Sequence, residues 1–169
     1  KLMSLFQQER RVVWLALAAV LVLMLGAGYL LLPGTTKEPT DFRGMKWGSN
    51  LRDLPELRLL AEEGDLKFFE KVNELTRIGD ADVDKIIYGF YKDQFYNVMI
   101  YFSSPGDFSR LREAFAKELG PPFQPVESES KCFWNGKQVN LLLNYDEVSA
   151  TGRVIYLFKP IQLEIEVSG

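Results

Sequence analysis

The sequence contains no histidine and a single cysteine, and both facts narrow the chemistry open to this chain. Histidine is the commonest general base in enzymes and the commonest metal ligand, so its absence removes the simplest routes to acid–base catalysis and to a metal centre. With Cys132 alone, an intramolecular disulfide is excluded. The apolar neighbours Phe133 and Trp134 favour a buried thiol, and the alternative is a disulfide to a second molecule.

Signatures of active sites are also absent. The chain has no glycine-rich phosphate loop, no nucleophile elbow and no zinc-ligand spacing. The pattern Asp80-x-Asp82-x-Asp84 begins like a calcium loop, but Lys85 stands where that loop needs glycine and Tyr91 where it needs glutamate. The other acidic pairs lie in polar, turn-like segments. We therefore expect no metal, no cofactor and no enzymatic activity.

Basic residues are not in excess, because the chain has 20 Lys and Arg residues and 23 Asp and Glu residues. Three of the basic and one of the acidic residues lie before residue 12, which leaves 17 basic and 22 acidic residues in the rest of the chain. A nucleic-acid interface needs a basic patch, so this balance argues against a nucleic-acid partner.

One long uncharged run stands out, Val12–Leu32, with 21 residues. As a helix with a rise of about 1.5 Å per residue, it would be about 30 Å long, the thickness of a bilayer's hydrocarbon core. The sequence therefore predicts a transmembrane helix that acts as a signal anchor. A cleaved signal peptide is the alternative, but its apolar core is usually shorter, about 7–15 residues. We expect a tail at 1–11, the helix at 12–32, a linker at 33–40 and an extracytoplasmic domain at 41–169.

Residues at the ends of this run suggest its orientation. The pair Arg10 and Arg11 abuts the run and favours a cytoplasmic N-terminus, while Trp14 and Tyr29 are typical of membrane interfaces. The predicted location is the bacterial inner membrane, with the C-terminal domain in the periplasm. Small residues let helices approach closely, so we expect a partner helix to pack at Ala16, Ala19 and Gly26. The alternative is that these residues are only the ordinary alanine and glycine content of such a run.

Residues 41–102 read mainly as strands. Phe42–Trp47 predicts a first strand, and two apolar runs, Leu57–Ala61 and Leu66–Val72, predict a hairpin around an acidic turn. Val83–Tyr91 and Phe95–Phe102 predict the clearest hairpin. Alternation in its second strand places Phe95, Asn97, Met99 and Tyr101 on one face and Tyr96, Val98, Ile100 and Phe102 on the other.

The rest of the chain adds a helix and more strands. Ser104–Leu119 has an N-cap serine, a first-turn proline, an apolar stripe and a glycine stop, and therefore predicts a helix. Asn135-Gly136 predicts a hairpin between strands at 131–134 and 137–145. Further strands are expected at 153–159 and at Ile161–Val167, which alternates apolar and polar residues. The predicted fold class is α+β, with antiparallel hairpins packed by one main helix beyond the N-terminal transmembrane helix.

Several landmarks resemble those of uncharacterised bacterial envelope domains. They are Phe42-Arg43-Gly44-Met45-Lys46-Trp47-Gly48-Ser49, Tyr88-Gly89-Phe90, Leu119-Gly120-Pro121-Pro122, Trp134 and Ile155-Tyr156. The layout is also loosely similar to small periplasmic modules of the outer-membrane assembly lipoprotein and β-lactamase-inhibitor-like type. The resemblance covers Phe42 to about Lys159 and implies an exported scaffold or binding module. This chain differs from the lipoprotein relatives because it has an apolar run in place of a lipidated cysteine.

These observations support two hypotheses. The first is a non-catalytic single-pass membrane protein whose periplasmic domain contacts other membrane-protein subunits as an accessory or assembly subunit. The second is a membrane-tethered binding domain for a lipid or small apolar ligand. The 22 aromatic residues mainly predict a core, and the ones we expect at a ligand or partner surface are Trp47, Phe68, Phe69, Tyr96 and Trp134.

Overall fold

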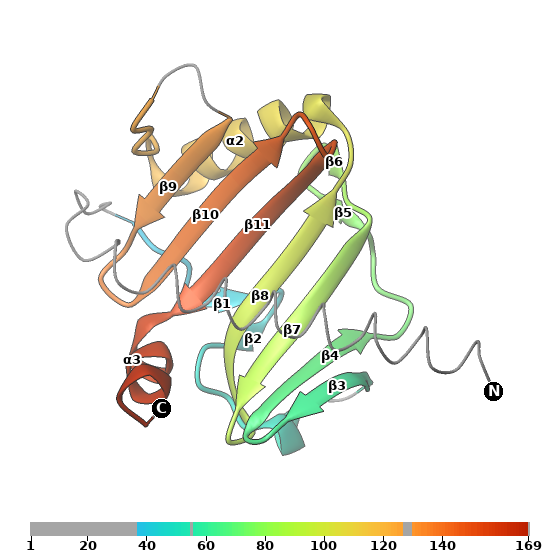
Figure 1. Cartoon of the computed structure of the whole chain (residues 1–169), viewed down its shortest axis with the longest axis vertical. Coiled ribbons are helices and arrows are strands. Elements are labelled where there is room, and N and C mark those ends of the chain that lie inside the picture. Colours follow the sequence, from blue (N-terminus) through green and yellow to red (C-terminus); the bar gives the residue numbers. More distant parts are fainter. Residues whose placement is uncertain (1–36, 55, 127–129, 169) are drawn as a thin grey trace.

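The computed structural model describes residues 37–54, 56–126 and 130–168. Most of the strands in this part join one antiparallel sheet with the order β3-β4-β7-β8-β11-β10-β9 (Figure 1). Two short hairpins, β1–β2 and β5–β6, lie outside that sheet. The strands and helices are β1 (Asp41–Phe42), β2 (Met45–Lys46), η2 (Leu51–Asp53), β3 (Leu57–Glu63), β4 (Leu66–Lys71), β5 (Arg77–Ile78), β6 (Ala81–Asp82), β7 (Lys85–Tyr91), β8 (Gln94–Phe102), α2 (Pro105–Leu119), β9 (Lys131–Asn135), β10 (Val139–Asp146), β11 (Thr151–Phe158) and α3 (Lys159–Ser168).

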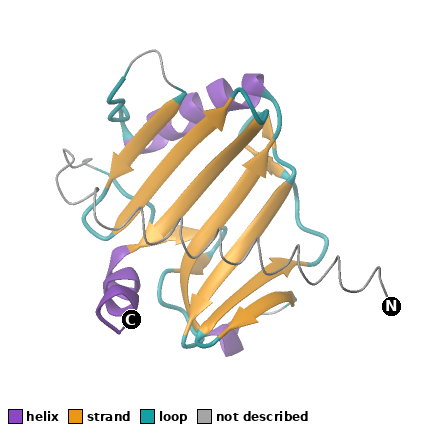
Figure 2. Cartoon of the chain, viewed as in Figure 1, coloured by secondary structure: helices purple, strands orange, loops and turns teal. Residues whose placement is uncertain are grey.

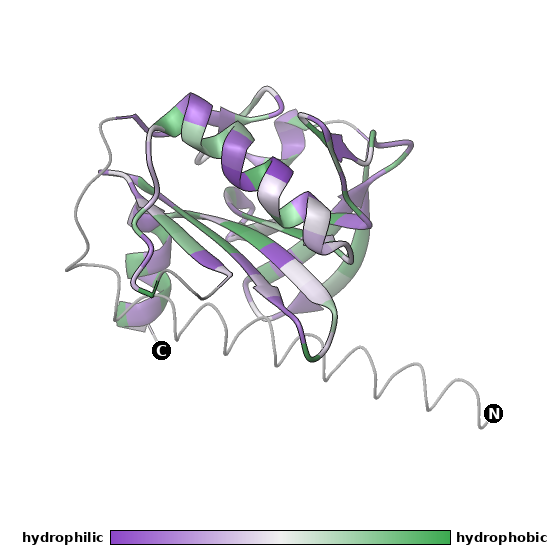
Figure 3. Cartoon of the chain, turned by 90° about the horizontal axis from the view of Figure 1, so that it is seen from above, coloured by the Kyte–Doolittle hydropathy of each residue, from purple (hydrophilic) through white to green (hydrophobic). Residues whose placement is uncertain are grey.

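The main core lies on the face of the sheet that α2 covers, called the inner face here (Figures 2 and 3). Alternate residues of β8 point into it because side chains in a strand alternate between faces. Tyr88 from β7 and Trp134 from β9 are almost fully buried there. The inner-face residues of β8 and the apolar stripe of α2 complete this core: Val98, Ile100, Phe102, Phe108, Leu111, Phe115 and Leu119.

The predicted helix at 104–119 is confirmed, together with the signals that predicted it. Ser104 is the N-cap, and its side chain accepts a hydrogen bond from the Gly106 N–H at 3.2 Å. Pro105 occupies the first turn, where no N–H is needed. Gly120 ends the helix with a φ of 96°, a left-handed value that favours glycine. The hairpins predicted from 57 to 72 and from 83 to 102 are also confirmed, as β3–β4 and β7–β8. The hairpin predicted at 131–145 is present as β9–β10, but its turn is at 136–138 because Asn135 is the last residue of β9.

The opposite face, called the outer face here, carries a second and smaller apolar cluster. Ile161 of α3 packs there against Tyr91, Tyr96 and Leu157, so α3 covers one corner of this face. The expected alternation along β8 is wrong at its start, because Phe95 points to the inner face and Tyr96 to the outer face. The reason is a β-bulge between Gly89 and Phe90, which shifts the register of the β7–β8 pair by one residue.

The predicted fold class is wrong for the described residues. An α+β domain with a transmembrane helix and one main helix was expected, but 47% of these residues are in strands or bridges and 22% in helices. The hairpins β3–β4, β7–β8 and β9–β10 belong to one sheet, because β11 pairs with β8 and joins the two groups of strands. There are two α-helices in this part, and neither is long and apolar enough to span a bilayer. The run Val12–Leu32 lies outside the described residues.

Two strand predictions are also wrong. The strand expected at Phe42–Trp47 is split into β1 and β2, because Arg43 and Gly44 both have positive φ values and form the turn between them. The strand expected at Ile161–Val167 is part of α3. Pro160 has no N–H to donate to a neighbouring strand, but it suits the first turn of a helix. In a helix Ile161 and Ile165 also share one face, and that face packs on the sheet.

Candidate functional site

A groove of about 740 Å³ opens on the outer face, between the bulged edge strand β3 and the strands that follow it in the sheet. We call it the β3 groove. It draws residues from β3, β4, β7, β8, β11 and the segments that flank β7 and β8. Its lining consists of Arg58, Leu59, Leu60, Ala61, Phe68, Asp84, Lys85, Ile87, Met99, Tyr101, Phe102, Ser103, Thr151 and Gly152.

The middle of the β3 groove is apolar and comes from three strands. Phe68 and Met99 are 5% and 4% exposed, and Ile87 lies opposite Met99 in the β7–β8 register. The hydroxyl of Tyr101 adds a polar atom, and burial raises the pKa of Tyr101 against the opposing effect of Arg153. Because the hydroxyl stays protonated at neutral pH, it can donate a hydrogen bond but cannot act as a base.

Charged side chains stand at the rim of the β3 groove. Arg58 forms an ion pair with Glu70, and the Lys85 Nζ lies 4.0 Å from the same carboxylate. The side chains of Arg58 and Lys85 are 71% and 46% exposed, so both cations remain open to solvent. Asp84, next to Lys85 in the chain, accepts a hydrogen bond from the Ser103 hydroxyl. The arrangement suits binding of an apolar group flanked by polar or charged atoms.

The strand at this side of the sheet, β3, pairs with β4 and stands at the end of the strand order. Leu59 of this strand is 49% exposed. At the other end of the sheet, Phe123 pairs with Phe133 of β9 through two backbone hydrogen bonds of 2.8 and 2.9 Å. The described part of the chain therefore covers a portion of the β9 edge but presents the β3 edge to solvent (Figure 1).

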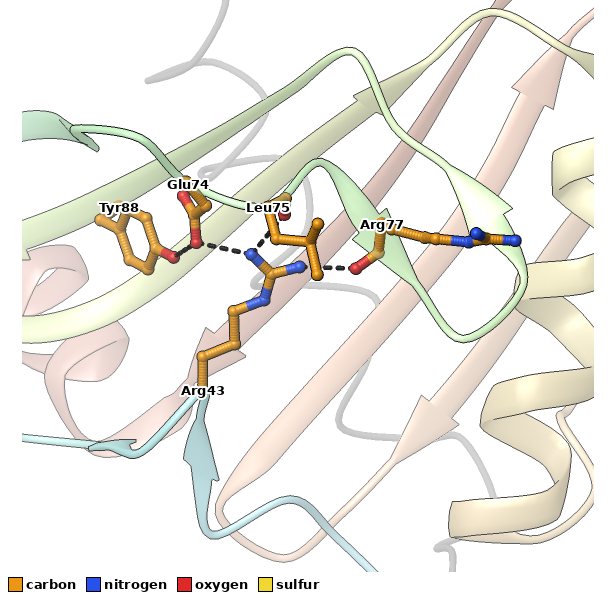
Figure 4. A network of polar contacts seen from close by, with 5 residues as sticks. All are labelled: Arg43, Glu74, Leu75, Arg77 and Tyr88. Carbon is orange, nitrogen blue, oxygen red and sulfur yellow. Dashed lines mark hydrogen bonds and ion pairs between the residues drawn. The ribbon is translucent and has the colours of Figure 1, made fainter.

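A second polar cluster, at the inner side of the sheet, joins the β1–β2 turn to the segment after β4 (Figure 4). The Arg43 guanidinium donates to Glu74, to the Leu75 carbonyl and to the Arg77 carbonyl, each at 2.7 Å. The Tyr88 hydroxyl donates to the same Glu74 oxygen. Burial, followed by the Glu74 carboxylate, raises the pKa of Tyr88 far above its ordinary value, so this hydroxyl keeps its proton and stays a hydrogen-bond donor. The cluster is suited to holding the two loops together.

A third cluster anchors the start of the described chain. The Glu38 carboxylate accepts hydrogen bonds from the backbone N–H groups of Gln138 and Val139 at 2.7 and 3.0 Å. Nearby, the Lys159 ammonium donates to Asn135 and to the Gly136 carbonyl at 2.8 and 2.6 Å. Burial lowers the pKa of Lys159, against the opposing effect of Glu38. The last part of the expected linker at 33–40 is therefore bound to the sheet at the start of β10.

The structure brings one of the five expected surface aromatics to the β3 groove, namely Phe68. Phe69 and Trp134 belong to the inner core, where the Trp134 indole donates to the Gly120 carbonyl at 2.8 Å. Tyr96 lies under α3 and is fully buried. Trp47 stacks on Phe95 at 4.9 Å between ring centroids, and its indole donates to the Pro39 carbonyl.

The other expected site residues fall elsewhere. The predicted interface anchors and small residues lie outside the described residues: Arg10, Arg11, Trp14, Ala16, Ala19, Gly26 and Tyr29. Cys132 is a buried free thiol, and burial raises its pKa. In the described part of the chain, no group of three or more acidic or cysteine side chains has metal-binding geometry. Sequence reasoning missed every lining residue of the β3 groove except Phe68, and the charged, mixed pattern of β3 gave no signal for a groove.

Comparison with known proteins gives no relative: no family model, no curated protein and no solved structure matches this chain.

Proposed function

We propose that this chain is a non-catalytic, single-pass protein of the bacterial inner membrane whose periplasmic domain binds a partner protein. It acts as an accessory or assembly subunit of a membrane complex. The observation that carries the proposal is the combination of the β3 groove with the solvent-facing edge of β3. Exposed sheet edges and apolar grooves are the features with which proteins bind extended or helical segments of other proteins.

The chemistry of the described residues supports a binding role. The strongly shifted groups, Tyr88, Tyr96 and Tyr156, are tyrosines whose pKa values are raised mainly by burial, so they remain protonated and do not act as nucleophiles. The acidic side chains at the β3 groove are engaged, Glu70 by two cations and Asp84 by Ser103.

Membrane attachment through Val12–Leu32 is the part of the proposal that rests on the sequence. Pro39 and Glu38 are bound to Trp47 and to the start of β10, so few residues separate the run from the folded domain. The domain would then stay within a few tens of Å of the membrane surface. Ala16, Ala19 and Gly26 are the positions at which a partner helix would pack against the run.

A second function is favoured by the size and lining of the β3 groove. Its volume of about 740 Å³ lies within the range of about 300–1,000 Å³ that is typical of small-molecule sites. The apolar side chains of Phe68, Ile87 and Met99 would suit the acyl chain of a lipid or a similar apolar ligand, with Arg58 and Lys85 near its polar end.

Site-specific photo-crosslinking in native membranes tests these functions. A photoreactive residue replaces Ile87 in the β3 groove, and the control replaces Val148, which is 99% exposed in the β10–β11 turn. We expect a protein adduct at position 87 and none at 148, with the adduct identified by mass spectrometry after mild detergent extraction. A lipid-sized adduct at position 87 would instead support the second function. Equal labelling at both positions, or no adduct at position 87, contradicts both.

A further inference from the structure

The pattern of charges along β3 has a symmetry that the binding role does not require. The strand reads Leu-Arg-Leu-Leu-Ala-Glu-Glu, with a cation near its start and two carboxylates at its end. In an antiparallel pair of two such strands, the start of one lies beside the end of the other. Opposite charges on directly facing residues stabilise a strand pair, whereas like charges oppose it.

The bulge in β3 determines which residues can meet. Arg58 is opposite Glu70 and Glu63 is opposite Leu66 in the β3–β4 register, which slips by one residue between Leu59 and Ala61. Because Glu70 and Leu66 are four residues apart in β4, they share a face, and so do Arg58 and Glu63. In a regular strand five residues would have placed these two side chains on opposite faces. The bulge therefore brings the cation and the carboxylate to the same face.

We propose that the β3 edge pairs with the β3 edge of a second copy of this chain, in antiparallel register around a two-fold axis near Leu60. Arg58 of each copy then faces Glu63 of the other, so the axis generates two equivalent ion pairs. The exposed Leu59 and the half-buried Leu60 lie near the centre. Isologous two-fold contacts of this kind are the commonest in homo-oligomers.

Other observations agree with this pairing. Lys85 lies 4.0 Å from Glu70, so this carboxylate keeps a cation when Arg58 turns toward the second copy. The β3 strand has seven residues, and its bulge limits the registers in which a second strand can pair with it. The inference rests on the proposed function in one respect, since tethering both copies to one membrane raises their effective concentration and makes a small interface sufficient.

Disulfide trapping of the full chain in membrane vesicles tests the contact. Leu60→Cys is made in a Cys132→Ser background, with Val148→Cys as the control because Val148 is far more exposed. In this register Leu60 faces Ala61 of the second copy, so the two Cα atoms at position 60 are offset by one residue and lie about 6 Å apart, within the range of about 4.4–6.8 Å that a disulfide needs. We expect mild oxidation to give a covalent dimer for Leu60→Cys and little for Val148→Cys. Equal yields, or a monomer for Leu60→Cys, overturn the proposal.

Charge reversal supplies the second readout. Arg58→Glu and Glu63→Arg each place like charges at both ion pairs, so we expect the dimer dissociation constant to rise about tenfold in either variant. The double variant restores opposite charges and is expected to return to the original value. If the double variant is as weak as the single ones, Arg58 and Glu63 do not face each other and the register is wrong.

The two proposals fail in different ways. If Leu60→Cys forms no dimer while Ile87 still gives an adduct with another protein, the second copy is excluded and the protein-binding function stands. If Leu60→Cys dimerises while Ile87 labels no protein, self-pairing stands and the accessory-subunit function is excluded.

Discussion

Replacing Tyr88 with phenylalanine tests whether the cluster of Arg43, Glu74 and Tyr88 stabilises the fold. The substitution removes one hydroxyl and keeps the ring, which packs against Phe42 and Phe95. It deprives the Glu74 carboxylate of a hydrogen-bond donor at a place where that side chain is 9% exposed and Tyr88 is fully buried.

The expected cost follows from the charge of the acceptor. Hydrogen bonds to charged groups contribute about 1.5–3 kcal/mol, compared with about 0.5–1.5 kcal/mol for neutral pairs. Because the Arg43 guanidinium still compensates the carboxylate, we expect the free energy of unfolding to fall by about 2 kcal/mol, a factor of about 30 in the equilibrium constant. The matched control is Tyr145→Phe, whose hydroxyl donates to the neutral Ser103 carbonyl at 3.2 Å.

Urea unfolding in a mild detergent, followed by tryptophan fluorescence, gives both free energies. An unchanged denaturant slope in each variant would show that the difference lies in stability and not in the extent of unfolding. The reasoning is refuted if Tyr88→Phe costs no more than Tyr145→Phe, because the buried carboxylate would then gain nothing from its second donor.

Three further predictions concern packing, capping and pH. Gly152→Ala would place a Cβ 2.1 Å from the Phe102 ring, so we expect the free energy of unfolding, measured by thermal unfolding, to fall by at least about 1–3 kcal/mol. For Gly64→Ala we expect it to fall by about 1 kcal/mol, because the added methyl group meets nothing within 4 Å. Ser104→Ala removes the N-cap of α2 and should cost about 1 kcal/mol by the same assay, whereas Ser104→Asp should cost little. The pKa values of Tyr88, Tyr96 and Tyr156 are raised above the ordinary value of 10.0, so the unfolded chain loses these protons first and stability should fall as the pH rises above 10. A pH titration in which all seven tyrosines ionise while the chain stays folded would contradict this last expectation.

Elements with strong local signals could be predicted from the sequence. The helix α2 carries its own cap, proline and stop, and β7 and β8 are long and rich in β-branched and aromatic residues. These features act within a few residues of each other. The prediction therefore did not depend on the rest of the fold.

The β3 groove could not be predicted, because it depends on contacts between distant segments. Phe68, Met99 and Gly152 meet there only because β4, β7, β8 and β11 are neighbours in the sheet. The face on which Tyr96 lies was set by a bulge, which leaves no mark in a period-two pattern. In α3, alternation suggested a strand, but Ile161 and Ile165 also satisfy helical spacing, and packing on Tyr91 and Tyr96 decided between the two.

The strand order also has a consequence for folding kinetics. Within the seven-stranded sheet, every pairing other than β8–β11 joins strands that are close in sequence, whereas Asn97 of β8 faces Leu157 of β11, sixty residues later. The groups β3-β4-β7-β8 and β11-β10-β9 can therefore collapse early, while closing the loop between them delays the joining of β8 to β11. We expect the rate-limiting step of folding to be the formation of this seam, so that destabilising the contacts across it, at Val98 or Val154, slows refolding.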